Sequence, residues 1–186
     1  MVSSAVYRYF PSRDELLTAL IIDAYQAVGE AAEQAESRVR RSDLAGRWLA
    51  TARAMRRWAL EHPQEYALIY GSPVPGYAAP ADTISPAARI PLLLTQLCVA
   101  ATESGRPLTA DHRPMPRPVR ADLKALRESL APTVDEHRLA VALMALTQLV
   151  GSISFELFGH LHNTVRDYEA YFDYQMRGVG RQLGLG

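Results

Sequence analysis

The stretch VSSAVYRYFPSRDELL, residues 2–17, decides the fold at the start of the chain. Pro11 ends whatever precedes it, because the residue before a proline is disfavoured in the helical region. Ser12 and Glu15 then fit the S-x-x-E pattern of a capping box, whose two side chains accept hydrogen bonds from free backbone N–H groups. The apolar residues that follow recur at helical spacing: Leu17, Leu20, Ile21, Ala24 and Val28. We therefore expect an amphipathic helix that fades near Gly29, followed by a polar stretch to Arg41.

In the rest of the chain, apolar residues also recur every three to four positions, as in helices. No stretch shows the alternation of apolar and polar residues that is typical of strands. Pro63 breaks the pattern after a helix over about 44–61 and opens a short one. Thr133 and Glu136 form a second capping box, which opens the most apolar helix, running to about Leu161. Further helices are expected over about 90–101, 119–130 and 167–183, with proline-rich loops over 71–88 and 107–118. The sequence predicts an all-α fold.

The composition is that of an ordinary globular chain of 186 residues, 48% hydrophobic and 22% charged. Its 20 basic and 20 acidic side chains cancel, which excludes a strongly basic nucleic-acid coat and a disordered chain of high net charge. Cys98 is the only cysteine, so a disulfide framework and a cysteine-based zinc site within one chain are excluded. The N-terminus has no charged leader and no apolar run, so we expect no signal peptide and a cytoplasmic protein.

From Leu139 to Phe155 the chain runs for seventeen residues without a charge, close to the length that spans a bilayer. Because Thr147 and Gln148 lie inside this window, we expect a buried helix and no membrane partner. A helix this apolar in a small domain often buries a second face against another subunit, and small residues allow helices to approach closely. We therefore expect a homodimer with a four-helix interface that contains Ala142, Ala145, Leu149, Ser152, Phe172 and Val179.

Residues 2–17 resemble the second half of the helix-turn-helix in the tetracycline-repressor (TetR) family of bacterial regulators. The family pattern is a Val-Ser start, a short recognition helix ending in Leu/Val-Tyr-x-His/Tyr-Phe, and a Ser/Asn-Lys/Arg-x-x-Leu-Leu turn into a connecting helix. This chain meets it with Val2-Ser3, Val6-Tyr7-Arg8-Tyr9-Phe10 and Ser12-Arg13-Asp14-Glu15-Leu16-Leu17. Trp58-Ala59-x-x-His62-Pro63 and Glu156-Leu157-Phe158-Gly159-His160 are similar to one subgroup of the family's regulatory domains. The resemblance implies a TetR-like helical regulatory domain behind a partial helix-turn-helix.

The resemblance also implies which residues touch DNA. In the family the recognition helix enters the major groove with its N-terminal end toward the base edges. That end corresponds to Ser3, Ser4 and Ala5 here, and family positions that touch phosphates correspond to Tyr7, Tyr9 and Arg13. A phenolic hydroxyl or a guanidinium donates hydrogen bonds to phosphate oxygens, which suits that role.

The family's domain begins with two further helices that complete the helix-turn-helix, whereas this chain starts at the recognition helix. Residues 1–13 carry only Arg8 and Arg13 as charged side chains, which is a small electrostatic footprint for DNA. We therefore expect a shortened regulator that binds DNA poorly as residues 1–186 alone. Residues 1–28 are the expected remnant of the DNA-binding domain plus the connecting helix, and residues 29–186 the expected ligand-binding and dimerisation domain.

The resemblance implies a repressor that binds operator DNA as a dimer and is released when a small-molecule effector changes the spacing of the two recognition helices. Aromatic residues on helices expected to pack together predict a pocket for a largely apolar effector: Trp48, Trp58, Tyr66, Tyr70 and Phe155. The same side chains are also typical of a plain core. The loop over 71–88 is either a flap over this pocket or a connection.

No catalytic residues are expected, because the nucleophile elbow G-x-S-x-G and the phosphate loop are both absent. Glu156 and His160 lie four residues apart on one helix face, with His162 nearby. A hydrogen bond at a helix end explains them better than a metal site, so we expect neither metal nor cofactor. A second class of function stays open, a headless helical sensor or dimerisation module that acts through protein partners.

Overall fold

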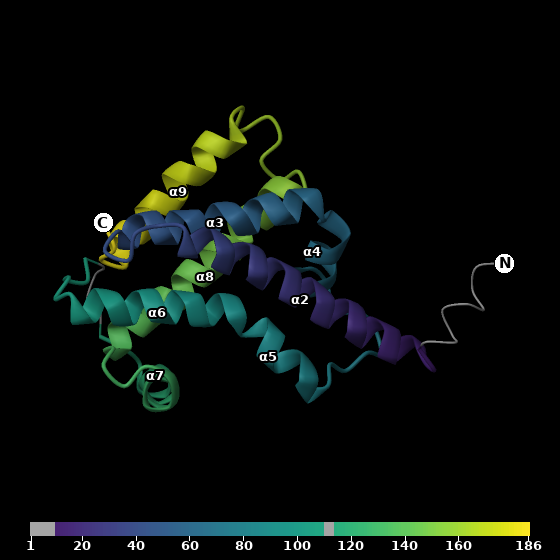
Figure 1. The fold of residues 1–186 in the computed structure, drawn as a ribbon, viewed down its shortest axis with the longest axis horizontal. Helices are drawn as coiled ribbons and strands as arrows, with labels where there is room; N and C mark the ends of the chain where they lie inside the picture. The colour runs from purple at the N-terminus through teal and green to yellow at the C-terminus, as the bar shows by residue number, and fades with distance from the viewer. Residues whose placement is uncertain (1–9, 110–113) are drawn as a thin grey trace.

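The computed structural model describes residues 10–109 and 114–186, and every regular element within these ranges is helical (Figure 1). The prediction of an all-α fold is confirmed. The elements in chain order are α2 (Arg13–Ser37), α3 (Leu44–Glu61), α4 (Pro63–Tyr70), the 3-10 turn η1 (Ala81–Thr83), α5 (Ile84–Ala87), α6 (Arg89–Glu103), α7 (Arg117–Leu130), α8 (Glu136–Leu157) and α9 (Tyr168–Gln182).

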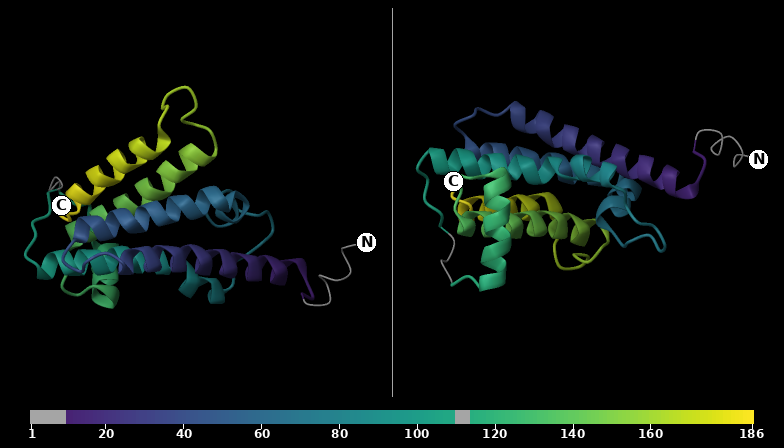
Figure 2. Two further views of the ribbon diagram at one scale, coloured as in Figure 1. Left: turned by 45° about the horizontal axis from the view of Figure 1, so that its top comes forward. Right: turned by 90° about the horizontal axis from the view of Figure 1, so that it is seen from below.

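α3 is the central helix of the fold. It packs along α2 and along α9, and it also contacts α6 and α8. Figure 2 shows α8 and α9 side by side on one side of α3, with α2 and α6 on the other. α7 packs crosswise on α8. The long helices therefore form two layers around α3, and the core lies between them.

α2 begins at the capping box predicted from the sequence, where the Ser12 hydroxyl accepts a hydrogen bond from the Glu15 N–H at 3.1 Å. The expectation that this helix fades at Gly29 is wrong, because α2 continues to Ser37 and crosses residue 28 without a break. Ala32 in the added turns is fully buried, and the buried Glu36 accepts hydrogen bonds from the α3 residue Arg47. Residues 30–36 are all Glu, Ala or Gln, which are good helix formers, so local propensity and these tertiary contacts both extend the helix.

The predicted helix over 44–61 and the short helix opened by Pro63 are confirmed as α3 and α4. Asp43 caps α3, because its carboxylate accepts a hydrogen bond from the Gly46 N–H at 2.8 Å. The loop predicted over 71–88 is only partly irregular, since η1 and α5 occupy residues 81–87. This helical segment meets α6 at an angle of 44°. The bend places residue Ala88 at a junction that borders two cavities described below.

α8 begins and ends inside its predicted limits. Asp135 caps the helix, with its carboxylate accepting from the Arg138 N–H at 3.0 Å, so the predicted capping box at Thr133 is wrong. The helix stops at Leu157 and not at Leu161, because Gly159 takes a positive φ of 78° that ends the helical turn. α8 has the length and the mean hydropathy, 1.6, of a membrane span. It packs on α3, α6, α7 and α9 within this chain, but only 33% of its most apolar window is buried, so the expected burial holds for the face turned to these helices and not for the rest.

Trp48 anchors α9 on α3. Its indole N–H donates a hydrogen bond to the Met176 carbonyl oxygen at 2.7 Å, and both residues are buried. A Cβ atom added at Gly180 would lie 3.0 Å from the Trp48 ring, so glycine permits the close approach. The long-range contact fixes how the C-terminal helix sits on the central one.

Candidate functional site

A cavity of about 580 Å³ lies beside α2, and we name it the α2 cavity. Ile21 and Tyr25 of α2 form one wall, Ile69 of α4 another, and Tyr77 belongs to the segment 71–80 that closes it. The remaining wall is the α5–α6 junction, and no charged residue lines the cavity. Its size and apolar walls are those of a small-molecule site. The cavity is therefore suited to an uncharged, largely apolar ligand.

Two tyrosines tie the walls of the α2 cavity to α2. The Tyr25 hydroxyl donates a hydrogen bond from α2 to the Ile69 carbonyl oxygen of α4 at 3.2 Å. The Tyr77 hydroxyl is hydrogen-bonded to the Thr18 hydroxyl of α2 at 2.9 Å. Any ligand that displaces α4 or the segment 71–80 therefore acts directly on α2.

Tyr25, Tyr66 and Tyr70 form an aromatic cluster next to the cavity. The Tyr70 ring lies 5.9 Å from Tyr25, edge to face, and 5.1 Å from Tyr66. The Tyr66 hydroxyl donates to the Val150 carbonyl oxygen at 2.9 Å and is hydrogen-bonded to Ser154 at 3.0 Å. Burial raises the pKa of Tyr66 to about 12 and also raises the pKa values of Tyr25 and Tyr70. The cluster is therefore neutral at physiological pH.

Arg89, the first residue of α6, binds α2 next to the cavity. Its guanidinium donates to the Glu33 carboxylate at 2.8 Å and to the Gln26 carbonyl oxygen at 3.1 Å. The hydrogen bond from Arg89 lowers the pKa of Glu33. Because Ala88 and Pro91 line the α2 cavity on either side of Arg89, this contact joins a cavity wall to the middle of α2.

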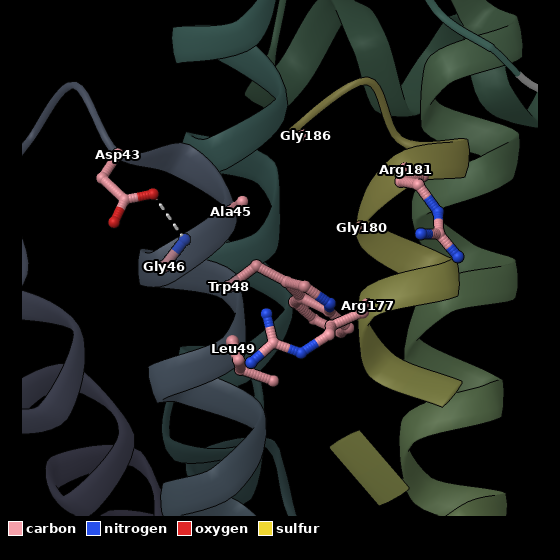
Figure 3. Close-up of a pocket in the computed structure, with 9 residues that line it drawn as sticks. All are labelled: Asp43, Ala45, Gly46, Trp48, Leu49, Arg177, Gly180, Arg181 and Gly186. Atoms are coloured by element: carbon pink, nitrogen blue, oxygen red, sulfur yellow. Dashed lines mark hydrogen bonds between the residues drawn. The ribbon is translucent and has the colours of Figure 1, made fainter. Parts of the chain in front are cut away.

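The five aromatic residues predicted to line an effector pocket are not brought together in one cavity. Trp48 lines a separate cavity of about 320 Å³ at the start of α3 (Figure 3). Figure 3 shows that Arg177 and Arg181 of α9 border this cavity, whose opposite side carries the capping residue Asp43. Trp48 is itself a buried core residue, and the cavity that it borders carries charged side chains and lies away from the tyrosine cluster.

The other four predicted residues lie in three further places. Tyr66 and Tyr70 belong to the tyrosine cluster, and Trp58 is buried and stacked on His62, with ring centroids 5.4 Å apart. Phe155 is 54% exposed on α8. Sequence reasoning missed the cavity residues Tyr25 and Tyr77. An aromatic residue beside the apolar stripe of α2 and another inside the proline-rich loop were the available signals.

The residues implied to touch DNA fall mainly outside the described part of the chain, namely Ser3, Ser4, Ala5, Tyr7 and Tyr9. Arg13 is described, as the exposed first residue of α2. Figure 1 shows the start of α2 projecting beyond α3 and α6.

The six residues predicted to form the dimer interface are all buried within the single chain: Ala142, Ala145, Leu149, Ser152, Phe172 and Val179. Five of them belong to the core, whereas Ser152 also lines a hollow on the outer face of α8 and α9. An interface on that face would therefore include Ser152 but not the other five. The same spacing of small residues that suits contact between subunits here serves packing inside one subunit.

The outer face of α8 and α9 carries an uncharged hollow of about 360 Å³. Gln148, Gly151 and Phe155 line it from α8, and Tyr171 and Gln175 from α9. A Cβ atom added at Gly151, or at Gly178 farther along α9, meets no described atom within 4 Å. Glycine inside a helix costs about 1 kcal/mol relative to alanine, and no contact within the described chain explains it at these two positions.

Glu156, weighed above as a metal ligand, forms an ion pair with Arg56. Two hydrogen bonds of 2.7 Å join the carboxylate to the guanidinium. No group of three or more metal-ligating side chains that suits a metal ion occurs among residues 10–109 and 114–186. Cys98 is fully buried, and burial raises the pKa of its thiol to about 12, so this thiol is unreactive.

Comparison with known proteins agrees with this architecture. Residues 48–179 match the family described as "Tetracyclin repressor-like, C-terminal domain". HTH-type transcriptional regulators Rv1816 of Mycobacterium tuberculosis (strain ATCC 25618 / H37Rv) and Mb1846 of Mycobacterium bovis are each 37% identical over 183 residues, 95% of this chain and 76% of theirs. A crystal structure of a regulatory protein, SCO4313, matches with a TM-score of 0.73 at 34% identity, covering 96% of this chain and 79% of that chain.

Fold and relatives together define the class of protein as an all-α, helix-turn-helix transcriptional regulator, and not an enzyme. The chain belongs to the tetracycline-repressor-like (TetR) family, which confirms the resemblance carried by residues 2–17.

Proposed function

We propose that the protein represses transcription by binding operator DNA as a homodimer, and that a small effector in the α2 cavity releases it. The observation that carries this proposal is that α2, which follows directly on the recognition segment, forms a wall of the cavity. A ligand shifts a conformational equilibrium only as far as it binds the two states differently. An effector that fits the cavity with α2 in one position and not the other meets this requirement.

The effector is uncharged and largely apolar, because an ion buried among these walls would lose its hydration without gaining a partner. The polar side chains of the lining are Tyr25, Tyr77 and Thr83, whose hydroxyl oxygens can accept a hydrogen bond from the effector while they keep their present partners. The Tyr70 ring packs edge to face against the Tyr25 ring. Trp48, Trp58 and Phe155 lie away from this cavity and take no part in the proposal.

The recognition segment supplies the proposed DNA contacts. Ser3, Ser4 and Ala5 would face base edges, and Tyr7, Tyr9 and Arg13 would donate to phosphates. The exposure of Arg13 at the projecting end of α2 agrees with this role. Since a bacterial regulator meets its operator in the cytoplasm, we propose that location.

The proposed dimer forms through the outer face of α8 and α9. Gly151 and Gly178 leave open space on this face, so the helices of a second copy approach closely without side-chain clashes. Phe155 and Tyr171, both exposed in the single chain, would be buried in the same contact. Dimer formation also accounts for the high apolarity of α8, which one small domain leaves partly exposed.

The experiment selects bound sequences from a pool of random DNA duplexes, using the protein expressed from its native gene. The expected result is a palindromic site with half-sites about one helical turn or a multiple apart. Binding to that site, measured by fluorescence anisotropy, should weaken steeply with salt. If no sequence is enriched and binding never exceeds that to scrambled DNA, the proposal of a DNA-binding repressor fails.

A further inference from the structure

A second cavity, of about 350 Å³, lies between α6, α7 and α8, and we name it the α7 cavity. Leu94 of α6 and Leu139 and Ala142 of α8 are buried residues that line it, and Leu126 comes from α7. Thr95 is the only lining residue with a polar side chain, and its hydroxyl already donates to a carbonyl oxygen at 2.9 Å. The lining side chains therefore offer a ligand no charge and no free hydrogen-bond donor.

The edge of the α7 cavity is also apolar. It is lined by four large apolar side chains that are exposed: Ile84, at 67%, Leu92, Leu130 and Leu143. A contiguous group of exposed apolar side chains around a hollow marks a binding site. Four such residues from α5, α6, α7 and α8 meet at this one place.

The α7 cavity is separate from the α2 cavity but adjoins it. Ile84, Ala88 and Pro91 line both, so the α5–α6 junction is a shared wall with one cavity on each face. The two cavities differ in chemistry, because the α2 cavity has two phenol hydroxyls and the α7 cavity has none. They are therefore suited to different ligands.

We propose that the α7 cavity is a second ligand site, which takes an uncharged, hydrocarbon-rich small molecule. A carboxylate or an ammonium group would be buried there without a partner. An extended peptide segment is a poorer occupant, since its backbone N–H and C=O groups would be buried with no side chain to pair them. This site goes beyond the proposed effector site, and neither depends on the other.

The test uses N-phenyl-1-naphthylamine, an uncharged dye whose fluorescence rises in apolar surroundings, with the purified chain. The matched variants are A142L, which adds bulk at a buried residue of the α7 cavity, and A79L, which adds bulk at an exposed residue lining the α2 cavity. Because Ala142 is buried, a further variant, L143D, places a charge at the exposed edge of the α7 cavity, where folding is least affected. Circular dichroism and the unfolding midpoint verify that each variant is folded.

We expect A142L to lose one dye site per chain, or to bind at it at least about tenfold more weakly, while A79L retains that site. L143D should weaken the same site, 1-octanol should displace the dye from it, and octanoate should not. The proposal is overturned if folded A142L and L143D both bind the dye as the unaltered chain does. Displacement by octanoate as readily as by 1-octanol would contradict the proposed ligand class, and if A142L does not fold, L143D decides alone.

Discussion

Arg89 lies across α2 in the space that Gly29 leaves open. A Cβ atom added at Gly29 would be 2.7 Å from Cδ and 3.0 Å from Cβ of Arg89, so the arginine stem fits only against glycine. The guanidinium beyond it binds Glu33, one turn along α2. Gly29 weakens α2 locally, but the contact between Arg89 of α6 and α2 requires a glycine at this position.

G29A should lower the free energy of unfolding by about 1–2 kcal/mol, because the clash with Arg89 outweighs the better helix propensity of alanine. The measurement is urea unfolding of G29A, R89A and the double variant. In the double variant the clash with Cδ of Arg89 is gone and only the 3.0 Å approach of the two Cβ atoms remains, so the two effects should not add and the coupling should exceed about 0.5 kcal/mol. Simple additivity would contradict a direct contact between these residues.

Acid should weaken the chain through Glu33 and Asp173. The hydrogen bond from Arg89 lowers the pKa of Glu33, and the one from Arg53 lowers the pKa of Asp173, from ordinary values of 4.5 and 3.8. Carboxylates with lowered pKa values stabilise the fold above these ordinary values, and this contribution is lost as the pH falls through the lowered values. The unfolding midpoint should therefore drop on acidification in this range. E33Q should make that drop shallower, and an unchanged slope would contradict the role of Glu33.

The buried pair of Glu36 and Arg47 should be far more sensitive than the surface pair of Asp173 and Arg53. R47M leaves a carboxylate in the core with only the exposed Arg41 as partner, at 3.0 Å, and should cost about 3 kcal/mol. R53M, the matched control, breaks a pair whose arginine is 45% exposed and should cost less than about 1 kcal/mol. Chemical unfolding of both variants checks the ranking, which equal losses would contradict.

If the dimer forms through the outer face of α8 and α9, substitutions on this face should change the molar mass of the protein in solution. G151E and G178R put charged side chains into the open space on α8 and α9, and each should turn a dimer into a folded monomer. E65R, on the exposed part of α4, is the control and should leave the dimer intact. Light scattering after size-exclusion chromatography measures the result. A monomeric unaltered chain at micromolar concentration, or dimers in all three variants, would exclude this interface.

Local signals predicted the helices well where a cap or a proline sets the limit. α3 has its predicted bounds because Asp43 and Pro63 act on neighbouring backbone groups. α2 runs past its predicted end because residues 30–36 are good helix formers although they are polar, and because Arg47, from another helix, binds Glu36. Sequence patterns carry no trace of such a partner until the chain is folded.

The sequence predicted an apolar pocket but did not predict which residues line the α2 cavity. Aromatic residues did indicate a pocket beside helices, but whether a ring is in the core, on the surface or at a cavity depends on helix rotation and tertiary contacts. Trp48 and Phe155 illustrate this, one buried against α9 and the other 54% exposed. Ala142 and Ala145 likewise have the size that suits a subunit interface, but both are buried by packing within the single chain.

The wall formed by Ile84, Ala88 and Pro91 separates two ligands if both cavities are filled. A ligand that binds one position of this wall better than another changes the shape of the cavity offered to the second ligand. Thermodynamic reciprocity then requires that the first ligand alters the affinity of the second by the same factor as the reverse. A regulator built in this way responds to a combination of two chemical signals, and its switching concentration for one signal is set by the level of the other.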